Sequence, residues 1–135
     1  MTHVKEMLDA YPKDLGDINR KKLTNCIAAC FECAQTCTAC ADACLSEDMV
    51  AEMAKCIRTN LDCSDICLAT GKVLSRHTGY DANITRAVLE ACRTACNACA
   101  DECEQHSGKQ GHCNFCAEQC RRCEKACDKL ISSLG

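Results

Sequence analysis

The chain has 135 residues, of which 18 are cysteine, and it carries a formal net charge of −3 from 16 basic and 19 acidic residues. Aromatic residues make up only 3% of the chain, so its composition provides neither the basic surface nor the stacking platform that nucleic-acid binding requires. No segment approaches the roughly 20 apolar residues that span a bilayer, and we expect one domain, residues 1–135, without nucleic-acid or membrane partners.

Residues 1–16 are predicted to form a short N-terminal helix and a linker. Thr2 is a candidate N-cap, and the helix is expected to stop near Tyr11 and Pro12 because proline cannot continue it. The first residues contain no apolar stretch or cleavage site typical of an export signal. We therefore expect a cytoplasmic protein, and persistent disulfides are rare in that compartment.

Four longer helices are predicted over residues 17–45, 47–74, 82–105 and 112–132. Ser46 is a candidate N-cap of the second of these, and the two acidic residues that follow it favour a helix N-terminus. Short connections make neighbouring helices antiparallel. The sequence therefore predicts an all-α, up-down-up-down four-helix bundle preceded by a short helix.

Cysteines recur at steps of three and four along all four long helices, which keeps their side chains on one helix face. This face would be leucine in an ordinary bundle, so the sequence predicts a core lined with cysteines. The positions are Cys26, Cys30, Cys33, Cys37, Cys40, Cys44, Cys56, Cys63, Cys67, Cys92, Cys96, Cys99, Cys103, Cys113, Cys116, Cys120, Cys123 and Cys127.

The other residues on these faces indicate how the two ends of the core differ. One end, the apolar end, is predicted to collect Leu23, Thr70, Leu74, Val88, Leu130, Ile131 and Leu134. The opposite end, the mouth, is predicted to collect Cys44, Met49, Met53, Cys103, His106, His112 and Cys113. We expect metal to enter at the mouth, because thioether and imidazole groups lie next to the thiols there.

Two explanations for so many core thiols do not require metal. Cysteine can act as a small buried hydrophobe, but a core made of such small residues would be loosely packed and costly. Disulfides are the second explanation. Cβ atoms at i and i+4 lie about 5–6 Å apart, whereas a disulfide needs roughly 3.8 Å, so full oxidation is not geometrically reasonable. Metal is the remaining means of filling the core.

Cu(I) fits the thiols better than zinc does. Each tetrahedral Zn²⁺ bound by four thiolates would leave two uncompensated negative charges in a dry core. Cu(I) is soft and monovalent, binds two or three thiolates, and neutralises the core at one ion per thiolate. With a metal–sulfur bond near 2.3 Å, a near-linear site needs sulfurs about 4.6 Å apart, which neighbours on one helix can reach. We expect multiple Cu(I) ions, roughly one per cysteine.

Five C-x-x-C pairs leave a dithiol oxidoreductase, an iron–sulfur protein or a zinc-binding protein as alternatives. However, the βαβ context of thioredoxin-type motifs and the C-x₂-C-x₂-C pattern of iron–sulfur ligation are both missing. The sequence also has no C-x-C or C-C pair of the kind found in metallothionein-like chains. No catalytic constellation or cofactor loop is visible, and we do not expect an enzyme.

The repeated C-x₃-C-x₂-C pattern on three helices resembles the cytosolic branch of the copper storage proteins, four-helix bundles whose lumens are lined with cysteines. The resemblance covers essentially the whole chain. It implies a homotetramer of bundles, each storing many Cu(I) ions on the cysteines given above. Such a protein would serve copper storage, buffering or detoxification and would receive its copper from a copper chaperone or a small-thiol donor. The exported branch has a leader and fewer cysteines, and the chain differs from that branch in both.

Several residues other than cysteine are candidate metal ligands. His106 continues the spacing after Cys103, and His112 precedes Cys113. Asn60 takes the place of the thiol missing from the third helix face, where an amide should hydrogen-bond to thiols or coordinate metal. Met53 and Met49 are also in register, although methionine at such positions more often packs the core.

Five further residues are expected to lie away from the metal. His3 and His77 fall in a terminus and a turn, where we expect exposure to solvent. Ile27, Phe31 and Leu45 form a second apolar stripe on the first long helix. We expect this stripe to pack helix against helix or subunit against subunit.

Overall fold

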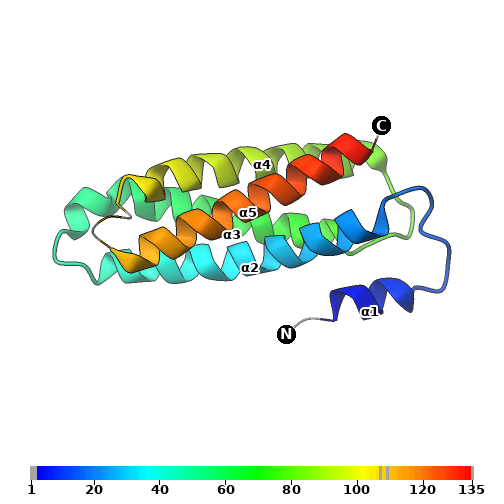
Figure 1. Cartoon of the computed structure of the whole chain (residues 1–135), viewed down its shortest axis with the longest axis horizontal. Coiled ribbons are helices and arrows are strands. Elements are labelled where there is room, and N and C mark those ends of the chain that lie inside the picture. Colours follow the sequence, from blue (N-terminus) through cyan, green and yellow to red (C-terminus); the bar gives the residue numbers. More distant parts are fainter. Residues whose placement is uncertain (1–2, 107, 109, 135) are drawn as a thin grey trace.

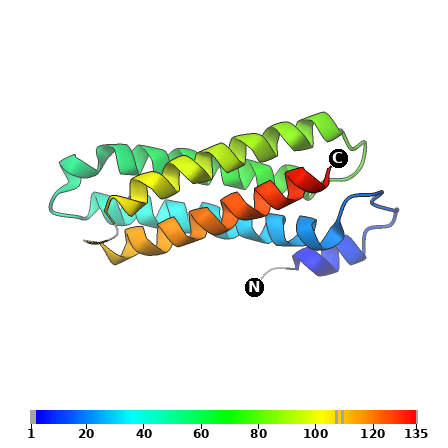
Figure 2. The same ribbon diagram turned by 45° about the horizontal axis from the view of Figure 1, so that its top comes forward.

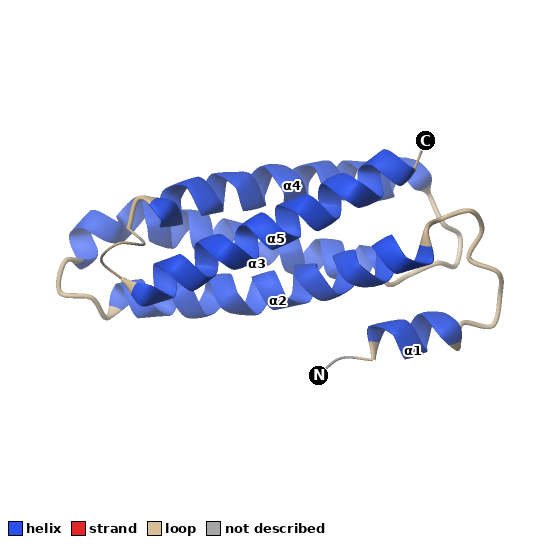
Figure 3. Ribbon diagram, in the orientation of Figure 1, coloured by secondary structure: helices blue, strands red, loops and turns tan. Residues whose placement is uncertain are grey.

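The computed structural model describes residues 3–106, 108 and 110–134, and its elements there are all helical (Figure 3). They are α1 (Val4–Asp9), α2 (Arg20–Leu45), the 3₁₀ helix η1 (Val50–Met53), α3 (Ala54–Leu74), α4 (Ala82–Glu104) and α5 (Gly111–Ser133). Helices α2 and α4 each pack against both α3 and α5, so the four long helices surround a common axis (Figures 1 and 2). This confirms the predicted all-α four-helix bundle with a short N-terminal helix.

Hydrogen-bonding side chains set where two of the long helices begin. Helix α2 begins at Arg20, and the prediction that it starts at residue 17 is wrong. The side-chain oxygen of Asn19 accepts a hydrogen bond from the backbone N–H of Lys22 at 3.0 Å, which makes Asn19 the N-cap. Asp81 caps α4 in the same way, and α4 begins at Ala82, as predicted. The predicted cap Thr2 lies outside the described residues.

The connection between α2 and α3 differs from the prediction. Ser46 does not cap α3, because its backbone continues the helical conformation and its N–H donates to the carbonyl of Ala43 at the end of α2. A turn and the short helix η1 follow, and α3 begins only at Ala54. This detour buries Met53 completely at the end of the core.

The apolar end has nearly the predicted composition. Leu23, Thr70, Leu74 and Leu130 are buried there, and Ile131 and Leu134 pack against them. The predicted contribution of Val88 is wrong: it is half-buried, and Leu89 is fully buried in its place. The buried face of α4 runs through steps of four and three from Thr85 to Leu89 and Cys92, and Leu89 therefore points inward.

The second apolar stripe of α2 packs only in part as predicted. Ile27 is buried, and Phe31 lies over Gly71 of α3, where an added Cβ would come within 2.9 Å of the ring. Gly71 therefore allows α2 and α3 to approach closely. Leu45, at the end of α2, remains 59% exposed, and its packing against another subunit stays a prediction. In the described part of the chain, no helix is long and apolar enough to cross a membrane.

Candidate metal centre

The bundle encloses a column of sulfur atoms. All 18 cysteines are free thiols and all are buried. Many sulfurs touch across helices, as between Cys26 and Cys127 at 3.8 Å and between Cys67 and Cys96 at 3.6 Å. Within one helix, the contact between Cys33 and Cys37 at 3.8 Å shows the i, i+4 spacing. The thiols therefore form one connected network along the axis rather than separate pairs.

The sulfurs group into sets whose ligand atoms all lie within 4.8 Å of one another. Four of these sets draw their thiols from three different helices each. Four thiols belong to more than one set, namely Cys33, Cys37, Cys63 and Cys120. The four sets are Cys30, Cys92, Cys123 and Cys127; Cys33, Cys63, Cys67 and Cys96; Cys33, Cys37, Cys63 and Cys120; and Cys37, Cys99, Cys116 and Cys120. Shared membership means that one thiolate can bridge neighbouring metal ions.

The sulfur spacing suits a metal with three ligands as well as one with two. Cross-helix contacts such as Cys37 to Cys120 at 3.6 Å and Cys92 to Cys123 at 4.0 Å are typical of the column. At a metal–sulfur bond of about 2.3 Å, two sulfurs of a trigonal site lie about 4.0 Å apart and two of a linear site about 4.6 Å apart. The sequence spacing predicts two-coordinate sites along each helix, whereas the structure adds closer partners from other helices.

The pKa values of the thiols differ along the column. Hydrogen bonding with Cys127, and then with Cys30, lowers the pKa of Cys26, near the apolar end, to about 5. At the mouth, burial raises the pKa of Cys44 to about 11 and that of Cys113 to about 12. A metal that binds at the mouth must therefore displace tightly held protons, and its affinity should increase with pH.

Asn60 lies inside the sulfur column and is fully buried. Its amide nitrogen donates to the carbonyl oxygen of Cys56 at 2.8 Å, and its amide oxygen accepts from the thiols of Cys116 at 2.9 Å and Cys99 at 3.3 Å. The amide nitrogen also lies 3.6 Å from the sulfur of Cys103. Asn60 thus occupies the gap in the α3 thiol face and connects thiols of three helices.

His112 points one ring nitrogen at the thiols of the mouth. Its Nδ1 lies 3.4 Å from the sulfur of Cys40 and 3.6 Å from that of Cys113, and these three residues form a set with Cys44. The other ring nitrogen, Nε2, lies 3.2 Å from a carboxylate oxygen of Glu47. A carboxylate in this position fixes the orientation and tautomer of a metal-binding imidazole and leaves Nδ1 free to coordinate.

The structure gives less direct support for the remaining predicted ligands. The Nε2 atom of His106 lies 3.6 Å from the carboxylate of Glu102, and Met53, the last residue of η1, is fully buried. The sulfur of Met49 accepts a hydrogen bond from the amide of Gln110 at 3.0 Å, and the amide oxygen of Gln110 lies 3.7 Å from the sulfur of Cys113. Gln110 therefore connects Met49 to the thiol column.

Sequence reasoning missed Glu47 and Gln110, although both carry a signal. Glu47 follows the last thiol of α2 by three residues, and Gln110 precedes the first thiol of α5 by three. These are the spacings that place a side chain on the thiol face just beyond a helix end. His3 is exposed as expected, but His77 is half-buried and its ring packs edge-on against Tyr11.

Comparison with known proteins relates the chain to one family. Residues 19–132 match the family model described as Csp, copper storage protein. A solved structure of the copper storage protein Ccsp from Streptomyces lividans, loaded with 10 copper equivalents, is 59% identical with a TM-score of 0.96, covering 96% of this chain and 98% of that chain. No curated protein matches the sequence.

Two further solved structures from Streptomyces lividans are similar. A cytosolic copper storage protein described with five coppers is 61% identical with a TM-score of 0.87, covering 89% of this chain and 100% of that chain. A Ccsp mutant with one histidine replaced by alanine is 61% identical with a TM-score of 0.88, with the same coverage.

Proposed function

Because the chain belongs to the copper storage protein family, we propose that it stores Cu(I) on the thiolates inside its bundle, at close to one ion per cysteine. The family implies storage rather than catalysis. The observation that carries the proposal is the column of 18 buried free thiols arranged in overlapping cross-helix sets. A set with shared members suits soft ions bridged by thiolates.

Charge balance favours the monovalent ion. Each thiol that exchanges its proton for Cu(I) leaves the core neutral, whereas Zn²⁺ bound by four thiolates leaves two negative charges. The described part of the core contains no lysine or arginine among its buried residues, so it offers no cation to balance such charges. Cu(I) is therefore the cargo that this interior accommodates at the least electrostatic cost.

Five other residues supplement the thiolates in this proposal. His112 coordinates at the mouth through Nδ1, because that nitrogen faces Cys40 and Cys113. Asn60 contacts metal-bearing thiolates at the centre of the column. Met53 and His106 serve as weaker donors where copper enters, alongside Met49.

Copper is expected to enter and leave at the mouth. In one variant, leucine replaces Met49 and Met53, and alanine replaces His106 and His112. This variant should change the rate of Cu(I) uptake or removal, because neutral donors transfer an ion inward without retaining it as a thiolate would. Capacity should stay within about two ions of the original, since the thiols that set it are intact. Rates come from stopped-flow exchange with a coloured Cu(I) chelator.

The control is a variant altered at the apolar end, with Leu23, Leu74 and Leu130 replaced by alanine. These side chains are fully or almost fully buried and offer no ligand. If this variant exchanged copper faster while the mouth variant behaved like the natural protein, copper would enter at the apolar end.

Asn60→Cys is expected to raise capacity by about one Cu(I) per chain. The position lies in the sulfur column between Cys56 and Cys63, so the new thiol would join existing sets. Asp65→Cys is the matched control, because Asp65 lies on the same helix with its side chain exposed. A chelator-competition titration of both variants gives the difference. Equal capacities for the two variants would show that position 60 is not in the metal-binding column.

We further propose a homotetramer in the cytosol that receives copper from a copper chaperone or a small-thiol donor. One observation supports assembly. Leu61 and Leu68 lie exposed on α3, and exposed apolar side chains favour burial between subunits. Light scattering should give a mass about four times the chain mass of 14.7 kDa. A mass equal to that of one chain would refute the tetramer.

A further inference from the structure

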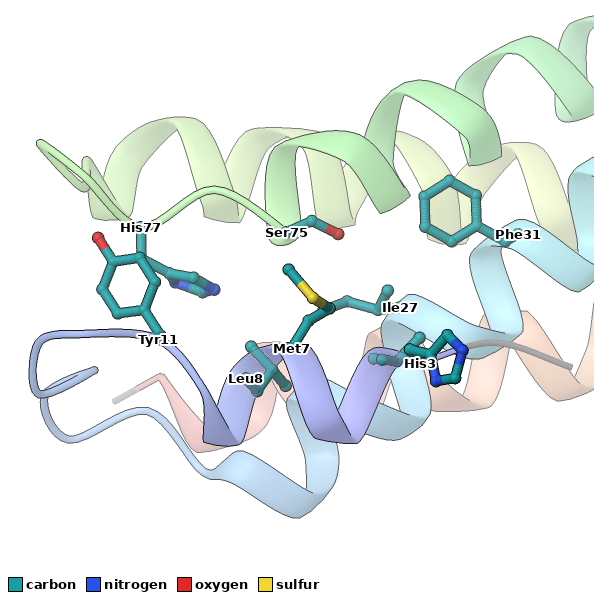
Figure 4. A pocket seen from close by; sticks show the side chains of 9 residues that line it. His3, Met7, Leu8, Tyr11, Ile27, Phe31, Ser75 and His77 are labelled. Carbon is teal, nitrogen blue, oxygen red and sulfur yellow. The ribbon is translucent and has the colours of Figure 1, made fainter.

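A pocket lies outside the bundle, at the end opposite the mouth, where α1 packs near the α3–α4 turn (Figures 1 and 4). Its volume is about 330 Å³. Leu8, Ile27 and Phe31 contribute apolar walls. Three other lining residues, His3, Met7 and His77, carry nitrogen or sulfur lone pairs, and none of the 18 thiols lines the pocket.

His77 has a ring nitrogen without a partner at this pocket. Its Nε2 atom is buried and has no hydrogen-bond partner within the described residues. The ring is held in place because it packs edge-on against Tyr11 at 5.4 Å, and the Tyr11 hydroxyl shares a 2.9 Å hydrogen bond with Thr78. A buried polar atom without a partner is unfavourable, so this nitrogen is expected to have a ligand.

A thioether and a second imidazole accompany His77. Figure 4 shows the Met7 side chain between the two histidines, with its sulfur in the pocket. Met7 is 69% exposed and has three rotatable bonds, so its sulfur can turn toward either ring. The Nδ1 atom of His3 faces the carboxylate of Glu6 at 3.5 Å, which leaves its Nε2 available.

We propose that His77 and Met7 form an accessory site for one soft monovalent cation, with His3 as a third donor at the rim. Imidazole and thioether are neutral, soft donors, which suit Cu(I) and its analogue Ag(I) and not magnesium or calcium. The carboxylate of Glu6 beside His3 partly balances the charge of the ion. Neutral donors bind such ions more weakly than thiolates do, so the site fills only after the thiol column.

Carbon-13 labelling of the methionine methyl groups allows the site to be tested in the whole protein. The chain has 4 methionines, and Met49 and Met53 lie at the far end of the bundle, so their signals report on events at the mouth. Silver nitrate is added to the reduced protein until the thiols are saturated, and then by two further equivalents. The Met7 methyl signal should stay unchanged up to saturation and shift only with the added excess.

His77→Phe removes the nitrogen and keeps a ring that can pack against Tyr11. In this variant the late Met7 shift should be lost or need at least tenfold more silver, while the number of ions needed to saturate the thiols is unchanged. A Met7 signal that never moves, or one that moves equally in His77→Phe, would overturn the accessory site. Neither result would affect the proposed thiol store, because saturation of the thiols is measured in the same titration.

Discussion

Reduced, metal-free protein titrated with Cu(I) in the presence of a competing chelator is expected to saturate near 18 ions per chain, one for each cysteine. The thiols lie close enough across helices for each thiolate to bridge two ions, as the overlapping sets around Cys33 and Cys37 show. One Cu(I) per thiolate also leaves the interior uncharged. The end point follows from the chelator's absorbance against added copper.

A variant that lacks one complete set provides the control for this capacity. Replacing Cys30, Cys92, Cys123 and Cys127 with serine should lower capacity by about four ions, because serine keeps the shape but does not bind Cu(I) comparably. Saturation of the natural protein at about four or five equivalents would instead indicate tetrahedral sites of the zinc type. The related structures with five and 10 coppers are compatible with partial filling of such a column.

The metal-free protein is expected to be helical at neutral pH and to unfold at alkaline pH. Leu23, Leu74 and Leu130 close one end of the core without metal, so the bundle should form from the reduced chain. Burial raises the pKa of Cys44 to about 11 and of Cys113 to about 12, above the ordinary thiol value of 9.0. Their contribution to stability is fully present below pH 9 and is lost as pH rises toward 11 and 12.

The expected size of this loss is large compared with the stability of a domain. Each thiol that ionises only in the unfolded chain costs about 1.4 kcal/mol per pH unit, and these two together cost about 3 kcal/mol per unit above pH 9. A typical domain has only about 5–15 kcal/mol to lose. Circular dichroism at 222 nm, followed from pH 7 to 12 under reducing conditions, should show cooperative loss of helix.

The copper-loaded protein is the matched control for alkaline unfolding, because its thiolates have no protons left to lose. It should keep its helical signal to higher pH, and copper should also stabilise the native state by binding to it preferentially. A random-coil spectrum of the metal-free protein at pH 7 would point instead to folding coupled to metal binding. Identical pH profiles with and without copper would contradict a role for buried thiols in this instability.

Spacing along the sequence predicted which residues face the core, because helix periodicity is a local property. All 18 cysteines, Met53 and Asn60 are buried as the steps of three and four require. The prediction that Val88 faces the core was wrong by one position, because Leu89 points inward instead. A step of three or four satisfies the pattern equally well, and packing against neighbouring helices decides between them.

Contacts between helices could not be predicted from spacing. The sulfur of Cys30 lies 3.9 Å from that of Cys92, and the two residues are 62 positions apart in the chain. Register and rotation of the helices determine such pairs, and neither is encoded in the spacing of one helix. The supporting residues Glu47 and Gln110 depend in the same way on how the connections fold over the mouth.

The start of α4 at Ala82 was predicted, and the structure adds that Asp81 caps it. Before α2, Asp17 and Asn19 are both possible caps, and only Asn19 makes the cap. Ser46 had the right residue type for a cap but continues α2 instead. The sequence contained no signal that His77 would be half-buried, because its burial depends on α1 folding back toward the α3–α4 turn.

Anomalous diffraction at the copper absorption edge, from crystals of the fully loaded protein, would locate the stored copper directly. We expect a row of copper peaks along the axis between α2, α3, α4 and α5, each bonded to two or three cysteine sulfurs, with about as many peaks as thiols. Copper confined to surface histidines and carboxylates, with the buried sulfurs unbound or joined in disulfides, would contradict this expectation.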